Sequence, residues 1–176
     1  MVFDFEFTTL QDVRQLKGLV DFLAKQNLDY PQYDSWVQRA EDELWQGYKS
    51  AVCAFSDGRL VGDVIHQPHK GVSRLLEIKN VRVHPDLRMR DFARFMLKQV
   101  EVEASLTGSY DALIGDVRPE QKESVNFLLN YGFRQVAVVP LYESAKPEIV
   151  VVKFLNSTGK GNILAGVKDS ILSRAI

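Results

Sequence analysis

The sequence predicts one mixed α/β domain over residues 1–155, followed by a linker and an amphipathic helix at residues 156–176. Three observations predict this organisation. Strand-like and helix-like segments alternate along the chain, an Asp-Gly pair separates two strand-like runs, and 45% of the 176 residues are apolar. A chain of this size and composition can bury a core without disulfides or metal ions.

The first quarter of the chain is expected to form a strand and two helices. The strand is the alternating run FDFEF at residues 3–7. A helix should follow within residues 8–26, because apolar residues recur at helical spacing and Thr9 and Asp12 have the spacing of a capping box. A weaker helical pattern covers residues 33–47.

The next region predicts a hairpin and then a distorted strand. Asp57 and Gly58 separate the runs KSAVCAF and RLVGDVIHQ, and this dipeptide strongly favours a two-residue hairpin turn. In the strand RLLEIKNVRV the apolar residues change from even to odd positions, a slip that would turn them to the wrong face. An extra residue near Lys79 and Asn80, a β-bulge, is the simplest repair.

The second half of the chain continues the alternation. Helices are expected at residues 92–104 and 119–132, and strands at residues 111–117, 134–139 and 148–155. Pro119 suits the first turn of its helix, and Gly132 suits a C-terminal cap. In the terminal helix Leu164, Val167 and Ile171 lie on one side. This helix should dock on its own domain, and a homodimer contact is the alternative.

Charge and cysteine usage restrict the partners and the compartment. The 22 lysines and arginines nearly balance the 23 aspartates and glutamates, so we expect no nucleic-acid or membrane partner. The single cysteine, Cys53, fits a buried small residue in a reducing compartment, and the N-terminal sequence lacks a signal-peptide pattern, so a cytoplasmic protein is expected. His84 and the histidines of an expected solvent-facing loop, His66 and His69, lack metal-ligand spacing, which predicts no metal site.

The stretch VHPDLRMRDFAR at residues 83–94 predicts an anion site. A strand, a short loop and a helix follow one another here, and a helix N-terminus offers backbone N–H groups and the positive end of the helix dipole. Arg88 and Arg90 add positive charge. A phosphate or pyrophosphate is the expected guest, and a solvated arginine cluster is the alternative.

The residues VRVHPDLRMRDFARFML resemble the acyl-coenzyme A signature of the GNAT superfamily of N-acetyltransferases, whose loop reads Arg/Gln-x-x-Gly-x-Gly/Ala. Arg88 stands at the first position of this motif, Asp91 replaces the first glycine, and Ala93 fills the last position. The run ALIGDV, the helix after it and the ending NYGF also resemble the family. The likeness covers residues 3–155.

The resemblance implies a GNAT-like mixed, mostly antiparallel sheet of about seven strands, splayed by a β-bulge in the fourth and flanked by about four helices plus the C-terminal helix. It also implies an acetyl-CoA-dependent N-acetyltransferase, in which a primary amine of an unidentified acceptor attacks the thioester directly in a ternary complex. Two alternatives are a catalytically silent acyl-CoA-binding module and a transferase that uses another acyl donor.

The resemblance further implies which residues hold the coenzyme. The pantetheine arm would contact the backbone of the fourth strand, and the loop and helix start would wrap the pyrophosphate: Val81, Arg82 and Val83 for the arm, and Arg88, Met89, Arg90, Asp91, Phe92, Ala93 and Arg94 for the pyrophosphate. Gln121 replaces a family asparagine that hydrogen-bonds the coenzyme. Asp91 should turn outward and cap the helix, with Arg90 offsetting its charge.

Glu77 is the expected general base, because some members of the family place a catalytic glutamate in this part of the splayed strand. The alternative is a surface carboxylate paired with Lys79 or Arg74. The family's tyrosine acid is missing from its usual position, so Tyr131 or Tyr142 is expected to protonate the thiolate. Solvent is the third alternative, because a thiol with a pKa of about 8.5 leaves readily.

Overall fold

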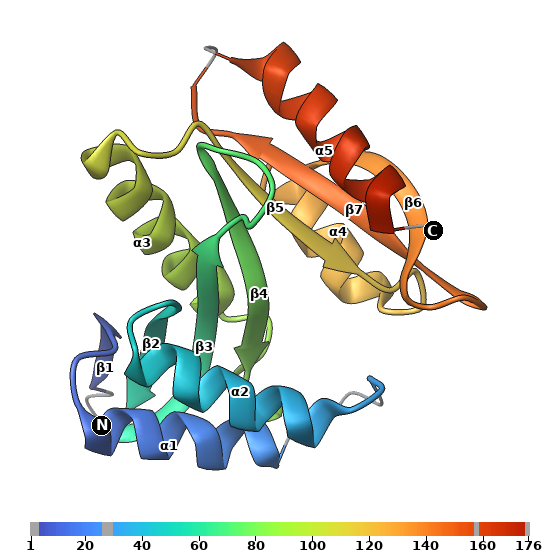
Figure 1. The fold of residues 1–176 in the computed structure, drawn as a ribbon. Helices are drawn as coiled ribbons and strands as arrows, with labels where there is room; N and C mark the ends of the chain where they lie inside the picture. The colour runs from blue at the N-terminus through green and yellow to red at the C-terminus, as the bar shows by residue number, and fades with distance from the viewer. Residues whose placement is uncertain (1–3, 26–29, 157–158, 175–176) are drawn as a thin grey trace. The chain divides into compact units, whose positions relative to one another are not determined.

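The computed structural model describes residues 4–25, 30–156 and 159–174, so Phe3 of the expected first strand and residues 157–158 of the expected linker lie outside the described residues. Over the described residues the expected mixed fold of about seven strands and five helices is confirmed (Figure 1). The strands are β1 (Phe5–Thr9), β2 (Ser50–Ser56), β3 (Arg59–Pro68), β4 (Leu75–Val83), β5 (Ala112–Val117), β6 (Arg134–Glu143) and β7 (Lys146–Phe154). The helices are α1 (Val13–Ala24), α2 (Tyr33–Trp45), α3 (Phe92–Thr107), α4 (Lys122–Asn130) and α5 (Lys160–Arg174).

The strands form one sheet in the order β1-β2-β3-β4-β5-β7-β6. The pairs β1–β2, β2–β3, β5–β7 and β6–β7 are antiparallel, whereas β4 and β5 are parallel. The chain divides into two compact units: unit 1 is Met1–Gln67 with Lys79–Val100, and unit 2 is Pro68–Ile78 with Glu101–Ile176.

Helix α1 begins with a cap three residues later than the sequence suggested. Asp12, rather than Thr9, is the capping residue, because its Oδ1 accepts hydrogen bonds from the backbone N–H groups of Arg14 (2.8 Å) and Gln15 (2.9 Å). The Oε1 of Gln15 reaches back and accepts from the N–H of Gln11 at 2.8 Å. Aspartate caps a helix as well as threonine does. Gln15, at the third helical position, adds a hydrogen bond back to the residue before the cap, much as in a capping box.

Strands β2 and β3 form the expected hairpin. Ser56 pairs with Arg59 across a two-residue turn, in which Asp57 has a φ of 49° and Gly58 a φ of 72°. Positive φ at both positions is the type I′ geometry, whose twist matches that of the flanking strands.

The β-bulge expected in β4 stays a prediction. The register that the structure defines for this strand covers Leu75–Glu77, where it pairs with β5, and does not extend to Lys79 and Asn80. A register irregularity does occur in the neighbouring hairpin, between Ala54 and Phe55 of β2.

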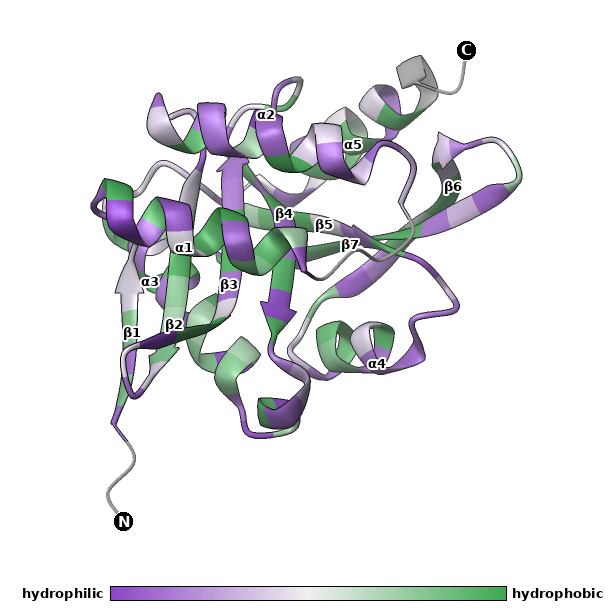
Figure 2. Ribbon diagram, turned by 90° about the horizontal axis from the view of Figure 1, so that it is seen from below, coloured by the Kyte–Doolittle hydropathy of each residue, from purple (hydrophilic) through white to green (hydrophobic). Residues whose placement is uncertain are grey.

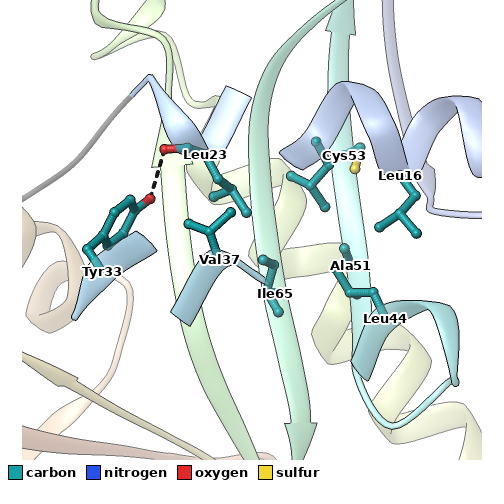
Figure 3. Close-up of a cluster of buried hydrophobic side chains, with 9 residues drawn as sticks. Leu16, Leu23, Tyr33, Val37, Leu44, Ala51, Cys53 and Ile65 are labelled. Carbon is teal, nitrogen blue, oxygen red and sulfur yellow. Dashed lines mark hydrogen bonds between the residues drawn. The ribbon is translucent and has the colours of Figure 1, made fainter. Parts of the chain in front are cut away.

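In unit 1, helices α1 and α2 cover one face of β2 and β3. Their apolar side chains close over the strands in one cluster (Figure 3), made of Leu16, Leu19, Leu23, Tyr33, Val37, Leu44, Ala51, Cys53 and Ile65. Figure 2 shows hydrophobic and hydrophilic residues alternating around both helices, the pattern of helices that are buried on one side. Cys53 is fully buried, and burial raises the pKa of its thiol to about 12, so it is a small core residue.

The first half of α3 covers the opposite face of unit 1. Thr8 of β1 lies beside Cys53, so the alternation along the strand turns Phe5 and Phe7 to the other side. There the ring centroid of Phe92 lies 5.1 Å from that of Phe5 and 5.5 Å from that of Phe7. Unit 1 therefore has a helix–sheet–helix arrangement.

In unit 2, helix α5 covers one face of the strands. Glu77 lies beside Ile114 in the parallel pair, so the alternation places Glu77 and Asp116 on the same face. The buried residues of this face form one cluster with α5: Val72, Leu75, Ala112, Ile114, Val150, Val152, Ile163 and Val167. The terminal helix α5 thus packs on its own unit, which agrees with the expected docking on its own domain.

Two details of α5 and one of α4 differ from the expectation. Helix α5 begins at Lys160, inside the expected linker. Over residues 160–171, whose side chains are described, the buried residues are Ile163 (4% exposed) and Val167 (2% exposed), while the expected Leu164 is half-buried. Gly166 lies so close to its neighbours that an added Cβ would lie 3.1 Å from the Cγ1 of Val72. Helix α4 begins at Lys122, three residues after the expected start.

Gly62 lets β3 lie close to the backbone of Arg82 and to the side chain of Met96. Its replacement tests the packing of unit 1. An added Cβ would lie 2.9 Å from the carbonyl oxygen of Arg82 and 2.9 Å from the Cε of Met96. Gly62→Ala should therefore lower the free energy of unfolding by roughly 1–3 kcal/mol, measured by urea denaturation. Gly18→Ala in α1, where a Cβ meets nothing within 4 Å, should instead raise it by about 1 kcal/mol. An equal loss in both variants would contradict the close approach at Gly62.

Candidate functional site

The loop after β4 has the backbone that the expected anion site requires. A 3-10 turn over Pro85–Leu87 leads into an extended Arg88, and α3 begins at Phe92. Met89 and Asp91 both have a φ of 60°, in the left-handed region. Asp91 thus adopts a conformation that glycine takes most easily, and its carbonyl oxygen accepts the 2.9 Å hydrogen bond that starts α3.

The carboxylate of Asp91 points outward, as expected, but its partner is not Arg90. The Oδ1 of Asp91 lies 3.1 Å from the Nε of Arg94, and 65% of the Asp91 side chain is exposed. Residues three apart on a helix lie on one face, which explains why Arg94 is the partner. The expected offset by Arg90 and the expected side-chain cap are replaced by this ion pair.

Three arginines give the loop a positive surface. Arg88, Arg90 and Arg94 are exposed, and the Nε of Arg88 donates to the carbonyl oxygen of Val83 at 3.4 Å. The first N–H groups of α3 and the positive end of its dipole lie at the same place. The arrangement suits a phosphate or pyrophosphate group.

The last residues of β4 are fixed by a chain of side-chain contacts within unit 1. Arg82 is 7% exposed, and its guanidinium carbon lies 5.3 Å from the centroid of the Tyr33 ring. The Nε of Arg82 donates to the Oδ1 of Asn80 at 3.1 Å, and the Nδ2 of Asn80 donates to the Oδ2 of Asp63 at 2.6 Å. These contacts hold the side chains of the strand whose backbone the resemblance assigns to the coenzyme.

Asp63 is a buried acid that the sequence analysis missed. It is the single acidic residue in the apolar run RLVGDVIHQ, and it is 0% exposed. Burial raises the pKa of its carboxyl group to about 7, although the hydrogen bond from Asn80 and the charge of Arg82 act in the opposite direction. Its Oδ1 has no hydrogen-bond partner among the described residues. An acid within an apolar strand was the signal that could have found it.

Glu77 lies on the face of unit 2 that α5 covers, and it is 7% exposed. It lines a cavity of about 30 Å³ together with residues of β5, β6, β7, α5 and the segment before β4: His69, Ile114, Gly115, Asp116, Leu141, Val150, Val167, Ser170 and Ile171. A cavity of this volume holds about one or two water molecules. The expected base is therefore buried, rather than on the surface.

The alternative partner Arg74 does not pair with Glu77. Its Nε and Nη2 donate to the two carboxylate oxygens of Asp111 at 2.6 and 2.7 Å. These bonds lower the pKa of Asp111 to about 2. The pairing of Glu77 with Arg74 was therefore a wrong alternative.

Tyr142 reaches the same region as Glu77 through Asp116. The hydroxyl of Tyr142 donates to the Oδ1 of Asp116 at 3.2 Å, and Asp116 lines the cavity with Glu77. The structure thus brings two of the three expected catalytic residues to one face of unit 2. The sequence analysis missed Asp116, although a carboxylate near the end of a buried strand is a detectable signal.

The expectation that His66 and His69 face solvent was wrong. His66 lies in β3 and is 9% exposed, while His69 is half-buried and lines the cavity. The Nδ1 of His69 accepts from the backbone N–H groups of Gly71 (3.1 Å) and Val72 (3.0 Å). A neutral His69 ring therefore carries its proton on Nε2.

Tyr131 is not brought to this cavity. The Nζ of Lys153 lies 3.9 Å from the centroid of the Tyr131 ring, and Lys153 pairs with Leu113, whose side chain points away from α5. Tyr131 also stacks on Phe127 at 5.9 Å between centroids. Gln121 precedes α4 without a side-chain cap bond. The roles expected for Tyr131 and Gln121 stay predictions.

The described part of the chain lacks both a metal-binding cluster and a membrane-spanning helix. Within it, no group of three or more His, Cys, Asp or Glu side chains is arranged to hold a metal ion. None of its helices combines the length and the apolar composition that crossing a bilayer requires.

Comparisons with known proteins agree on one family. A family model described as the acetyltransferase (GNAT) family matches residues 16–133. A solved acetyltransferase assigned to the GNAT family, from Desulfovibrio desulfuricans, is 17% identical over 87% of this chain and 100% of its own, with a TM-score of 0.76. No curated protein gave a significant match.

Two further solved structures contain coenzyme A. An aminoglycoside 6′-N-acetyltransferase is 18% identical over 86% of this chain and 97% of its own, with a TM-score of 0.68. A PaiA N-acetyltransferase from Thermoplasma acidophilum is 14% identical over 86% of this chain and 99% of its own, with a TM-score of 0.64. At these identities the likeness shows the fold.

The raised pKa of Asp63 predicts a pH-dependent stability. Between about pH 4 and pH 7 the unfolded chain loses the Asp63 proton while the folded chain keeps it, so stability falls as the pH rises, by at most about 4 kcal/mol. Asp63→Asn should remove this part of the fall, measured as urea midpoints at pH 5 and pH 8. Asp86→Asn, at a side chain that is 86% exposed, should keep the wild-type dependence. Parallel curves for wild type and Asp63→Asn would contradict the assignment.

Proposed function

The chain belongs to the acetyltransferase (GNAT) family, a family of acetyl-CoA-dependent N-acetyltransferases, and we propose that this member acetylates a primary amine. The neutral amine attacks the thioester carbonyl directly in a ternary complex. The new C–N bond forms as the C–S bond breaks, the amine gives up a proton, and the coenzyme A thiolate takes one up. The products are the acetylated amine and free coenzyme A.

One observation carries the coenzyme part of the proposal, namely the backbone of the loop before α3. Asp91 stands where the GNAT motif has a glycine, and it has a left-handed backbone, the conformation that glycine adopts most easily. The pyrophosphate would lie against the loop and the first N–H groups of α3, with Arg88 and Arg90 as charged donors. Outward rotation of the Asp91 carboxylate and its pairing with Arg94 reduce the repulsion.

The end of β4 is proposed to hold the pantetheine arm through its backbone. The side chain of Arg82 is engaged with Tyr33 and Asn80, so it is the backbone groups of Val81, Arg82 and Val83 that would bind the arm. Two structures of similar fold contain coenzyme A, which supports coenzyme binding by this fold in general.

Glu77 is proposed as the general base. A lysine-like amine with a pKa of about 10.4 is almost wholly protonated at pH 7, so its attack needs a group that accepts the proton. Glu77 lines a cavity that His69, Asp116 and Ser170 also line. Water held there would pass the proton from a bound amine to the carboxylate.

Tyr142 is the favoured general acid. Its hydroxyl reaches Asp116 at the cavity that Glu77 lines, whereas Tyr131 lies on the opposite face of unit 2. The hydrogen bond to Asp116 fixes the position of the hydroxyl, and the role of acid requires that the thiolate sulfur bind within hydrogen-bond reach of it. Protonation of the thiolate by solvent is the version without any side-chain acid.

A second candidate function is an acyl-CoA-binding module without transferase activity. The observation that favours it is the small volume of the cavity beside Glu77, which leaves little space for an acceptor. Release of free thiol from acetyl-CoA in the presence of a primary amine distinguishes the two functions, because only the transferase produces it.

Coenzyme affinity should change in opposite directions at two loop positions. Arg88→Ala should weaken acetyl-CoA binding by about 1.5–3 kcal/mol, the loss expected for a hydrogen bond to a charged group. Asp91→Gly should tighten it, because it removes a negative charge beside the phosphates and relieves the left-handed strain. Isothermal titration calorimetry measures both. Arg14→Ala, on the exposed side of α1, should leave the dissociation constant unchanged. Equal affinities in all four proteins would remove the loop from the site.

Glu77→Gln tests the base separately from the coenzyme site. It should lower kcat at pH 7 by about 10²–10⁴-fold, while the acetyl-CoA dissociation constant stays the same. Raising the pH should recover part of the activity, because more of the amine is then neutral. Glu41→Gln, in an exposed position of α2, is the matched control. An unchanged kcat in Glu77→Gln would assign proton removal to another group.

A further inference from the structure

Strand β6 bulges away from β7 near its end. Its register with β7 shifts between Val139 and Glu143, so three residues of β6 lie opposite the single residue Pro147 of β7: Pro140, Leu141 and Tyr142. Proline has no N–H to donate, and within sheets it is found at edges and bulges. Prolines on both strands therefore interrupt the ladder at the same place, and the extra residues of β6 leave the regular pairing.

The bulge changes the direction of the Tyr142 side chain. Neighbouring residues of a regular strand point to opposite faces of the sheet. Leu141 lines the cavity that Asp116 also lines, yet the next residue, Tyr142, donates its hydroxyl to the Oδ1 of Asp116 at 3.2 Å. Two consecutive side chains thus reach the same face of unit 2, which a bulge permits.

Glu148 of β7 supplies a hydrogen bond that the interrupted ladder lacks. Its side chain is 0% exposed, and its Oε2 accepts from the backbone N–H of Leu141 at 2.9 Å. Among the described residues, no donor lies within hydrogen-bond reach of its Oε1. A buried polar group is stable only when it is hydrogen-bonded, so the bond to Leu141 holds both the carboxyl group and the middle of the bulge in place.

Arg118 contacts the same bulge from the end of β5. It is 8% exposed, its Nη2 lies 2.8 Å from the Oε1 of Glu143, and its Nε lies 4.0 Å from the Oε1 of Glu148. The guanidinium therefore offsets the charge of both acids. Because the contact with Glu143 is the short one, Arg118 stays paired when the charge at position 148 is removed.

We propose that Glu148 is a positioning residue for the acid of the transfer reaction: by holding the N–H of Leu141, it keeps β6 in the bulged form that directs the Tyr142 hydroxyl to Asp116. The inference rests on the proposed function, in which Tyr142 protonates the thiolate, and it adds a residue that acts through Tyr142. The requirement is one of reach, because the side chain at position 148 must accept a hydrogen bond from Leu141.

Two substitutions in the full-length chain separate the reach of Glu148 from its charge. Glu148→Gln removes the charge but keeps the length of the side chain and an acceptor oxygen for Leu141. Glu148→Asp keeps the charge but shortens the side chain, so the carboxyl group withdraws from Leu141. Glu123→Ala, at an exposed position of α4, is the control for loss of a glutamate in unit 2. Thermal unfolding verifies that each variant is folded.

The position of Tyr142 is measured without catalysis, by fluorine NMR of the chain labelled with meta-fluorotyrosine. Tyr142→Phe identifies the resonance by its loss, and Asp116→Ala gives its chemical shift without the hydrogen-bond acceptor. Glu148→Gln and Glu123→Ala should keep the wild-type shift, whereas Glu148→Asp should move it towards the Asp116→Ala value. A wild-type shift in Glu148→Asp, or an equal displacement in Glu148→Gln, would overturn the inference.

Turnover is measured as thiol release from acetyl-CoA with a primary amine. Glu148→Asp should lower kcat by about tenfold or more, and by no more than Tyr142→Phe does, while Glu148→Gln stays close to the wild type. In the Tyr142→Phe background, Glu148→Asp should have no further effect, because both changes act on the same proton donor. Equal falls in the two backgrounds would show a merely structural role and overturn the positioning role.

The two readouts separate this inference from the proposed function. A displaced Tyr142 resonance in Glu148→Asp, together with full turnover in Tyr142→Phe, would retain the hold of Glu148 on the bulge and reject Tyr142 as the acid. Loss of turnover in Tyr142→Phe, together with an unmoved resonance and full turnover in Glu148→Asp, would retain the acid and reject Glu148 as its positioning residue.

Discussion

The parallel register of β4 and β5 is the constraint on which the position of the proposed catalytic residues in unit 2 depends. Because Glu77 lies beside Ile114 and side chains alternate along a strand, Glu77 and Asp116 share the face that α5 covers. A one-residue slip would turn Glu77 to the other face and leave the cavity without this carboxylate, the proposed base. The same slip would remove Leu75, which is 1% exposed, from the cluster under α5. Core packing and the position of Glu77 are therefore fixed by one register.

In the loop before α3, which is proposed to bind the coenzyme, the backbone conformation and the charge of the side chain at position 91 have separate effects. A glycine supplies the left-handed conformation and leaves space for a phosphate, whereas Asp91 supplies the conformation and carries a charge. Aspartate tolerates this region better than most residues do, at a cost on the order of 1 kcal/mol. The carboxylate is 65% exposed and paired with Arg94, so solvent and the guanidinium both weaken its field at the loop.

Features that depend on neighbours along the chain were predictable from the sequence, and features that depend on pairing between distant strands were not. The hairpin turn at Asp57 needs only its own dipeptide, and the anion loop needs only a strand–loop–helix order with arginines. Asp63 and Asp116 gain their roles from Asn80, 17 residues away, and from Tyr142, 26 residues away. The buried residue Ile163 was missed because it adjoins an expected linker, where the helical pattern is too short to fix the start.

The ring of Tyr33 makes two connections within unit 1. Its hydroxyl holds the carbonyl of Leu23 at the end of α1, and its face holds the guanidinium of Arg82 at the end of β4. Displacement of the first turn of α2 would withdraw a cation–π contact of about 0.5–2 kcal/mol from that strand. Two ligands that contact α2 and β4 would therefore change each other's affinity, and thermodynamic reciprocity makes the two factors equal.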